Sequence, residues 1–186
     1  MQGEKSGPAE SRRFEEVVLP HLDAAYNLAR WLVRDRQNAE DVVQEACLRA
    51  VKFFGGFRGG DAKAWLLRIV RNTAYSFLEK SRPAELTEEF DETLHVSAGE
   101  APRDAESALI QSAEAREVQQ ALEAVPVRFR EALVLRELEG LSYKEISEVM
   151  EIPIGSVMSA LARGRDRMRE EISRARGKEA ARGLRR

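Results

Sequence analysis

The stretch that decides the fold is LSYKEISEVMEIPIGSVMSALARGRDRMREEI, residues 141–172. Ser142 is followed three residues later by Glu145, which is the spacing of a capping box, so a helix is expected to begin here. Pro153 disfavours a helical conformation for the residue before it and can itself open a new helix. The stretch therefore predicts two helices joined by a very short turn, a helix-turn-helix.

The second predicted helix has an apolar stripe of Val157, Leu161 and Met168, and arginines at and beyond its middle. A helix-turn-helix places such a second helix in the major groove of DNA. A basic amphipathic helix alone would also fit a plain helical hairpin that its arginines keep soluble. The spacing of the cap, the core positions, the tight turn and the start of the second helix is that of a helix-turn-helix. We therefore predict that this segment binds DNA.

Composition limits the alternatives for the whole chain. Its 186 residues suffice for two small domains or one ordinary domain, and its net charge of −2 means that a basic DNA-binding surface must be local. The single cysteine, Cys47, excludes an intramolecular disulfide and fits a reducing cytoplasm; its apolar neighbours predict that it is buried. No stretch reaches the ~20 apolar residues of a membrane span, so we expect a cytoplasmic protein without membrane insertion.

Helical patterns fill the first part of the chain after residues 1–12, which are polar and expected to be disordered. An apolar stripe begins at Phe14, and Pro20 predicts a break in that helix. Asn38 can cap a second helix over residues 39–53. The exposed side of this helix carries Leu48 among polar residues, which hints at a protein-binding face.

The sequence FFGGFRGGD, residues 53–61, contains two Gly-Gly pairs that predict irregular backbone. No GK[ST] follows, so a triphosphate-binding loop is not expected. Two interpretations stay open. The segment is either a linker whose phenylalanines pack in the core, or a loop that offers Phe57 and Arg58 to unstacked bases.

Asp61 is expected to cap a long helix that ends near Lys80. Its predicted buried side contains Trp65, Leu66, Ile69, Val70, Thr73 and Phe77. The opposite side contains Arg68, Arg71, Asn72 and Tyr75. That side suits phosphates and bases, although an ordinary solvated face would look similar.

Residues 82–112 are rich in acidic residues and interrupted by prolines, so they predict a flexible linker between two domains, 13–81 and 113–176. The second domain should contain a helix ended by Pro126, a helix ended by Gly140, and the helix-turn-helix. Residues 177–186 read as a basic tail. From Arg163 onward, ten basic and four acidic residues leave a surplus of 10 − 4 = +6.

The chain resembles the extracytoplasmic-function sigma factors of the bacterial sigma-70 family. The segment AEDVVQEACLRAVKFFGGFRGGDAKAWLLRIVRNTAYSFLEKSR is similar to that family's region 2, and VPVRFREALVLRELEGLSYKEISEVMEIPIGSVMSALARGRDRMREEI is similar to its region 4. The resemblance implies an all-α protein of two small helical domains, and a subunit of RNA polymerase that starts transcription at promoters. It implies no enzyme activity and no cofactor.

The resemblance also assigns roles to faces. It implies that core RNA polymerase is bound by Asp41, Gln44, Glu45, Leu48 and Arg49. It implies that the minus-10 promoter element is captured and melted by Phe57, Arg58, Arg68, Arg71, Asn72 and Tyr75. It implies that the minus-35 element is read by Ser156, Met158, Ser159, Arg163 and Arg165. Promoter DNA and an anti-sigma factor are further expected partners.

Three residues depart from the family pattern. Glu151 stands in the turn where relatives commonly have glycine, and a non-glycine residue in the left-handed region costs roughly 1 kcal/mol. Met158 and Ala160 stand where relatives often have basic residues, which predicts weaker or altered minus-35 readout.

Two other functions are weighed against a sigma factor. A stand-alone regulator would bind duplex DNA through residues 127–176 and use the first domain for protein contacts. A recombinase with Ser142 as nucleophile is disfavoured because that serine is better used as a cap. His21 and His95 are isolated in the sequence and predict no metal site.

Overall fold

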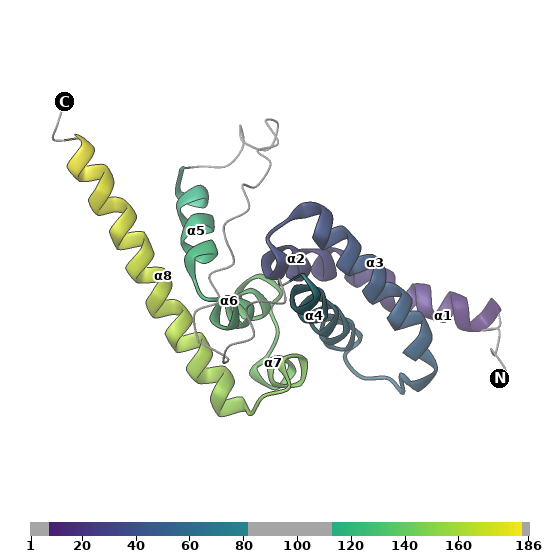
Figure 1. The fold of residues 1–186 in the computed structure, drawn as a ribbon. Helices are drawn as coiled ribbons and strands as arrows, with labels where there is room; N and C mark the ends of the chain where they lie inside the picture. The colour runs from purple at the N-terminus through teal and green to yellow at the C-terminus, as the bar shows by residue number, and fades with distance from the viewer. Residues whose placement is uncertain (1–7, 82–112, 184–186) are drawn as a thin grey trace. The chain divides into compact units, whose positions relative to one another are not determined.

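The structure, a computed structural model, describes residues 8–81 and 113–183 (Figure 1). These residues contain helices and no strand, which confirms the all-α prediction. They form two compact units, built mainly from residues 8–81 and 113–183. The predicted linker at 82–112 lies outside the described residues. None of the described helices combines the length and the apolar composition that a membrane-spanning helix needs.

The first unit opens with α1 (Pro8–Val18), a short 3-10 helix η1 (Leu19–His21) and α2 (Leu22–Val33). The break predicted at Pro20 is confirmed, because this residue lies in η1. The disorder predicted for residues 8–12 is wrong. Their helix packs on the rest of the unit through Phe14, whose ring lies edge-on to that of Phe54 at 5.2 Å, a tertiary contact that polar composition does not reveal.

Helix α3 (Arg36–Phe53) begins earlier than expected. Its N-cap is Asp35, whose carboxylate accepts a hydrogen bond from the backbone N–H of Asn38 at 2.8 Å, so Asn38 lies in the first turn and is not the cap. A 3-10 helix η2 (Phe54–Gly56) follows, so the glycine segment is not wholly irregular. Helix α4 (Ala62–Lys80) has the predicted cap: Asp61 accepts from the N–H of Ala64 at 2.7 Å.

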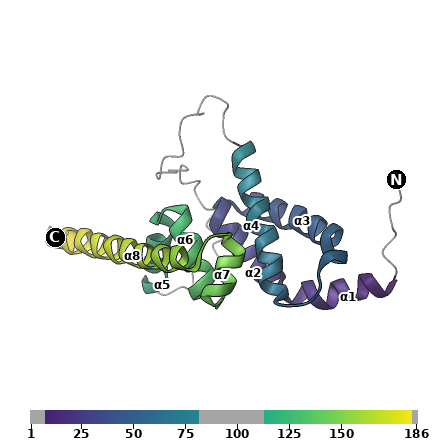
Figure 2. The same ribbon diagram turned by 90° about the horizontal axis from the view of Figure 1, so that it is seen from below.

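Helices α2, α3 and α4 pack against one another around one core (Figure 2). On the predicted buried side of α4, three residues are buried, namely Leu66, Val70 and Thr73, and three are half-buried, namely Trp65, Ile69 and Phe77. Cys47 is half-buried and not fully buried as predicted. Its partial burial raises the pKa of the thiol above the ordinary value.

The second unit contains α5 (Ala113–Ala124), α6 (Val127–Leu133), the π-helical segment η4 (Val134–Leu138), α7 (Tyr143–Met150) and α8 (Ile154–Gly183). Figure 1 shows α5 and α6 lying along α8, and both pack against it. The helix predicted over residues 127–138 therefore ends in a π-helical turn. Helix α8 is 30 residues long and includes residues 177–183, which the sequence placed in a separate tail.

The predicted helix-turn-helix is confirmed in detail. The N–H of Glu145 donates to the Ser142 hydroxyl at 3.2 Å, and the N–H of Ser142 donates to the Glu145 carboxylate at 2.6 Å, so both halves of the capping box form. Glu151 has a φ of 57°, the left-handed conformation expected at that turn. The carbonyl of Pro153 accepts the first hydrogen bonds of α8.

Two contacts that the sequence did not predict hold the second unit together. The Arg130 side chain, 2% exposed, donates to the carbonyls of Glu123 at 3.0 Å and Val125 at 3.1 Å, which ties the end of α5 to α6. Gly164 is buried where α8 crosses α6. A Cβ atom there would lie 3.0 Å from the Leu133 side chain and 3.2 Å from the Phe129 carbonyl oxygen.

Candidate functional site

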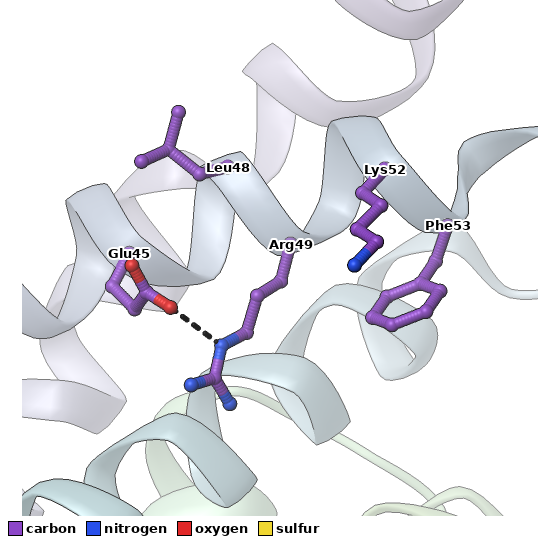
Figure 3. A pocket seen from close by; sticks show the side chains of 5 residues that line it. All are labelled: Glu45, Leu48, Arg49, Lys52 and Phe53. Atoms are coloured by element: carbon purple, nitrogen blue, oxygen red, sulfur yellow. Dashed lines mark hydrogen bonds and ion pairs between the residues drawn. The ribbon is translucent and has the colours of Figure 1, made fainter. Parts of the chain in front are cut away.

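The first candidate surface is a stripe along α3, which we call the α3 stripe: Asp41, Gln44, Glu45, Leu48 and Arg49. Spacings of three and four residues place the five on one side of the helix. Leu48 is 64% exposed, as predicted, and Glu45 pairs with Arg49 at 2.8 Å (Figure 3). The structure thus brings together an apolar side chain and charged groups of both signs, a surface suited to another protein.

The α3 stripe continues into an open hollow of about 440 Å³ lined by Glu45, Leu48, Arg49, Lys52 and Phe53 (Figure 3). Phe53 is 56% exposed, whereas Phe54 beside it is 3% exposed. Sequence reasoning did not separate these two rings. Helical spacing could have done so, because Phe53 lies four residues after Arg49 and Phe54 lies four residues after the buried Ala50.

The glycine segment after α3 contains one ring that is held in place and one charge that is exposed. Phe57 is half-buried, with its ring centroid 5.9 Å from Phe54 and 5.0 Å from Trp65. Arg58 is exposed, and it is followed by Gly59 and Gly60 with φ of 94° and 105°. The structure therefore separates the predicted pair: Phe57 packs with the core, and Arg58 projects from the loop.

The polar face of α4 lies next along the chain. Arg68 and Asn72 are exposed, and Arg71 and Tyr75 are half-buried. The Arg71 guanidinium lies 4.6 Å from the Tyr75 ring centroid and donates to the Asn72 carbonyl oxygen at 3.5 Å. The predicted residues thus form one patch with an aromatic ring, an amide and cations, which can contact both phosphates and bases.

The predicted minus-35 residues lie on two flanks of α8. Ser156, Ser159 and Arg163 share one flank, because they are three and four residues apart, whereas Met158 and Arg165 share the other, two turns apart. Met158 is 54% exposed and Arg165 is exposed.

The structure places Ala160 away from both exposed flanks of α8. This residue is 3% exposed, because it lies on the buried face of α8 with Val157 and Leu161. The methyl group of Ala160 therefore packs in the core of the unit. Of the two departures on α8, Met158 is therefore the one that lies on an exposed flank.

Most arginines of α8 already pair with carboxylates. Arg165 pairs with Glu137 at 2.8 Å, and this hydrogen bond, with a smaller one to Tyr143, raises the pKa of its guanidinium. Arg167, Arg169 and Arg174 pair with acids within α8, and Arg176 pairs with Glu117 of α5 at 2.7 Å, which lowers the pKa of that carboxyl. Among the described residues, Arg163 has no carboxylate partner and lies 6.0 Å from the Phe129 ring centroid.

Comparison with known proteins identifies the family of this chain. Residues 17–83 match Sigma-70 region 2, and residues 115–168 match Sigma-70, region 4. The RNA polymerase sigma-H factor of Pseudomonas aeruginosa is 36% identical over 163 residues, which are 84% of each chain. The chain belongs to the extracytoplasmic-function sigma factors of the sigma-70 family.

Two further comparisons agree with this membership. The ECF RNA polymerase sigma-E factor of Escherichia coli is 36% identical over 138 residues, covering 71% of this chain and 72% of the relative. The solved structure of the sigma factor RpoE from Bartonella quintana, in complex with the anti-sigma factor NepR, has a TM-score of 0.68 and 25% identity and covers 87% of this chain and 98% of that chain. The similarity thus extends to the fold.

The regions of this sigma factor map onto the surfaces described above. Region 2 includes the α3 stripe, the glycine segment and the polar face of α4. Region 4 includes the helix-turn-helix and ends at residue 168, so the last part of α8 lies beyond it. Within residues 8–81 and 113–183 no group of three or more His, Cys, Asp or Glu side chains could hold a metal ion.

Proposed function

We propose that this sigma factor binds core RNA polymerase through the α3 stripe, captures the minus-10 element with the glycine segment and α4, and reads the minus-35 element with α8. The observation that carries the proposal is the position of Leu48. It is 64% exposed in region 2 and lines one open hollow with the 56% exposed ring of Phe53, and exposed apolar side chains grouped in this way are typical of a protein-binding surface.

Opening of the minus-10 element would be driven by binding energy and not by a covalent step. A base that leaves the duplex loses stacking worth a few kcal/mol, which contacts with the protein must offset. Arg58 at the loop and the patch of Arg68, Arg71, Asn72 and Tyr75 on α4 supply cations, an amide and a ring for this purpose.

Reading of the minus-35 element would use both exposed flanks of α8. Arg163 can donate to guanine, with Ser156 and Ser159 beside it, and Met158 can pack on a thymine methyl group. Arg165 can reach a phosphate only by sharing its charge with Glu137.

Control by an anti-sigma factor is the second part of the proposal. Its support is the similarity to RpoE, which was solved with its anti-sigma factor NepR. Such a partner would cover the exposed apolar side chains of region 2 or region 4. The protein would act in the cytoplasm, together with the polymerase.

One experiment tests the main proposal. The purified chain is mixed with core RNA polymerase, pulled down, and used for run-off transcription on a fragmented genomic library. We expect a stable complex and transcripts from a defined set of promoters that core polymerase alone does not produce. A chain that binds duplex DNA but neither binds core polymerase nor starts transcription would be the stand-alone regulator instead.

A further inference from the structure

The N-terminal helix α1 covers the aromatic cluster at the base of the glycine segment. The Phe14 ring meets Phe54 edge-on at 5.2 Å, with an interplanar angle of 86°, and the Arg13 guanidinium lies 5.5 Å from the centroid of the same ring. Helix α1 also packs against α4, and Figure 2 shows it passing beside the start of that helix. As a result Phe54 is only 3% exposed.

Contacts continue from Phe54 to the loop. Its ring stacks on Phe57 with an interplanar angle of 19°, and Phe57 in turn lies 5.0 Å from Trp65. The N–H of Phe57 also donates to the Phe54 carbonyl at 2.9 Å. At the other end, Asp61 is fixed as the cap of α4. Only residues 58–60 lie between these anchors.

We propose that α1 is a positioning element for the loop tip. Phe14 and Arg13 hold Phe54, Phe54 and Trp65 hold Phe57, and Phe57 fixes the point from which Arg58 projects. Helix α1 itself needs no contact with DNA for this role. The consequence for transcription rests on the proposed function of Arg58, whereas the positioning of the loop does not.

The first arm of the test uses the full chain without polymerase. Hydrogen exchange of the backbone amides of residues 55–60 is compared between the wild type and Phe14→Ala, with Val18→Ala as the control. Val18 is a buried residue of the same helix at 1% exposure, outside the aromatic cluster. We expect Phe14→Ala to speed exchange in the loop about two- to tenfold, the range that one aromatic pair contributes, and Val18→Ala to leave it close to wild type.

The second arm measures opening of a duplex promoter by the holoenzyme, with permanganate as the probe. Phe14→Ala should reduce opening by about two- to tenfold while core binding stays unchanged, and a premelted promoter should restore activity. Phe14→Tyr keeps the ring and should behave as wild type. Arg13→Ala removes only an exposed side chain, so it should fold normally and reduce opening less than Phe14→Ala does.

Opposite results have distinct meanings. Loop exchange that is unchanged in Phe14→Ala, or equally raised in Val18→Ala, would overturn the positioning role. Faster loop exchange without any loss of opening would overturn its connection to transcription. A wild-type chain that opens no promoter with core polymerase would instead defeat the proposed function, and the exchange arm would still decide whether α1 positions the loop.

Discussion

Gly164 sets how closely α8 approaches α6. A mid-helix glycine destabilises a helix by about 1 kcal/mol relative to alanine, so its presence needs a reason. The reason is the close approach of α6, because a Cβ would meet the Leu133 side chain and the Phe129 carbonyl more tightly than side chains usually pack. The sequence showed only a glycine within a helical pattern, because the neighbour that excludes a side chain comes from a segment 31 residues earlier in the chain, 164 − 133 = 31.

Gly164→Ala should therefore lower the stability of the second unit. Overpacking costs typically ~1–3 kcal/mol, and the gain in helix propensity recovers only about 1 kcal/mol of it. Gly177→Ala is the matched control, because a Cβ at Gly177 on the same helix would meet no atom within 4 Å. Thermal unfolding should show a lower Tm for the first variant and an equal or higher Tm for the second. The opposite order would contradict the close approach.

The two flanks of α8 should differ in their contribution to DNA binding. Arg163 has no carboxylate partner among the described residues, whereas Arg165 pairs with Glu137. Arg163→Ala should lower the slope of log affinity against log salt by about one unit, and Arg165→Ala by less, because Glu137 already offsets its charge. Glu137→Gln should strengthen binding in the wild-type background.

Holoenzyme binding to a randomised minus-35 library at two salt concentrations separates these effects. Arg163→Ala should also change the preferred sequence at one base pair, by ~1–3 kcal/mol, if that side chain reaches a guanine. If Arg165→Ala alters the preferred sequence and Arg163→Ala does not, the proposed base contact of Arg163 and phosphate contact of Arg165 are reversed.

At the scale of helices, the sequence correctly predicted helix caps and breaks that depend on neighbouring residues. The capping box of Ser142 and Glu145, the cap at Asp61 and the break at Pro20 each depend on residues within four positions, and all three were confirmed. The different exposure of Phe53 and Phe54 also follows helical spacing, although it was not predicted, whereas the docking of α1 depends on tertiary packing. Residues 8–12 are polar but continue the helix whose Phe14 docks on Phe54.

The proposed role of α3 in binding core polymerase can be tested directly. Leu48→Asp places a charge on an exposed site, so the fold should persist, but affinity for core polymerase should fall about tenfold or more if Leu48 is an interface hot spot. Leu19→Asp is the control: Leu19 is 52% exposed but lies on η1, away from the α3 stripe in the sequence. Unchanged affinity of Leu48→Asp, with normal circular dichroism, would remove the α3 stripe from the interface.

For the molecule as a whole, charge is distributed in a way that disfavours DNA binding by the isolated chain. The net charge is −2, and the surplus of basic residues counted from Arg163 onward is reduced further by Glu137 and Glu117, which lie outside that count. Five of the six arginines at positions 163–176 form ion pairs within the chain. Helical spacing could have predicted the three pairs within α8 but not the other two, because Glu137 and Glu117 reach α8 from other segments.

The isolated chain should therefore bind duplex promoter DNA weakly, whereas the holoenzyme should bind it tightly. A stand-alone regulator must achieve specific affinity alone, typically 10⁻⁸–10⁻¹¹ M, and non-specific binding is typically 10⁻⁴–10⁻⁶ M. We expect the isolated chain in the second range, with a shallow salt dependence because five of the six arginines at positions 163–176 are paired. Fluorescence anisotropy with one promoter duplex, with and without core polymerase, measures both states. Nanomolar, sequence-specific binding by the chain alone would favour the stand-alone regulator. It would contradict the prediction that tight promoter binding needs the polymerase.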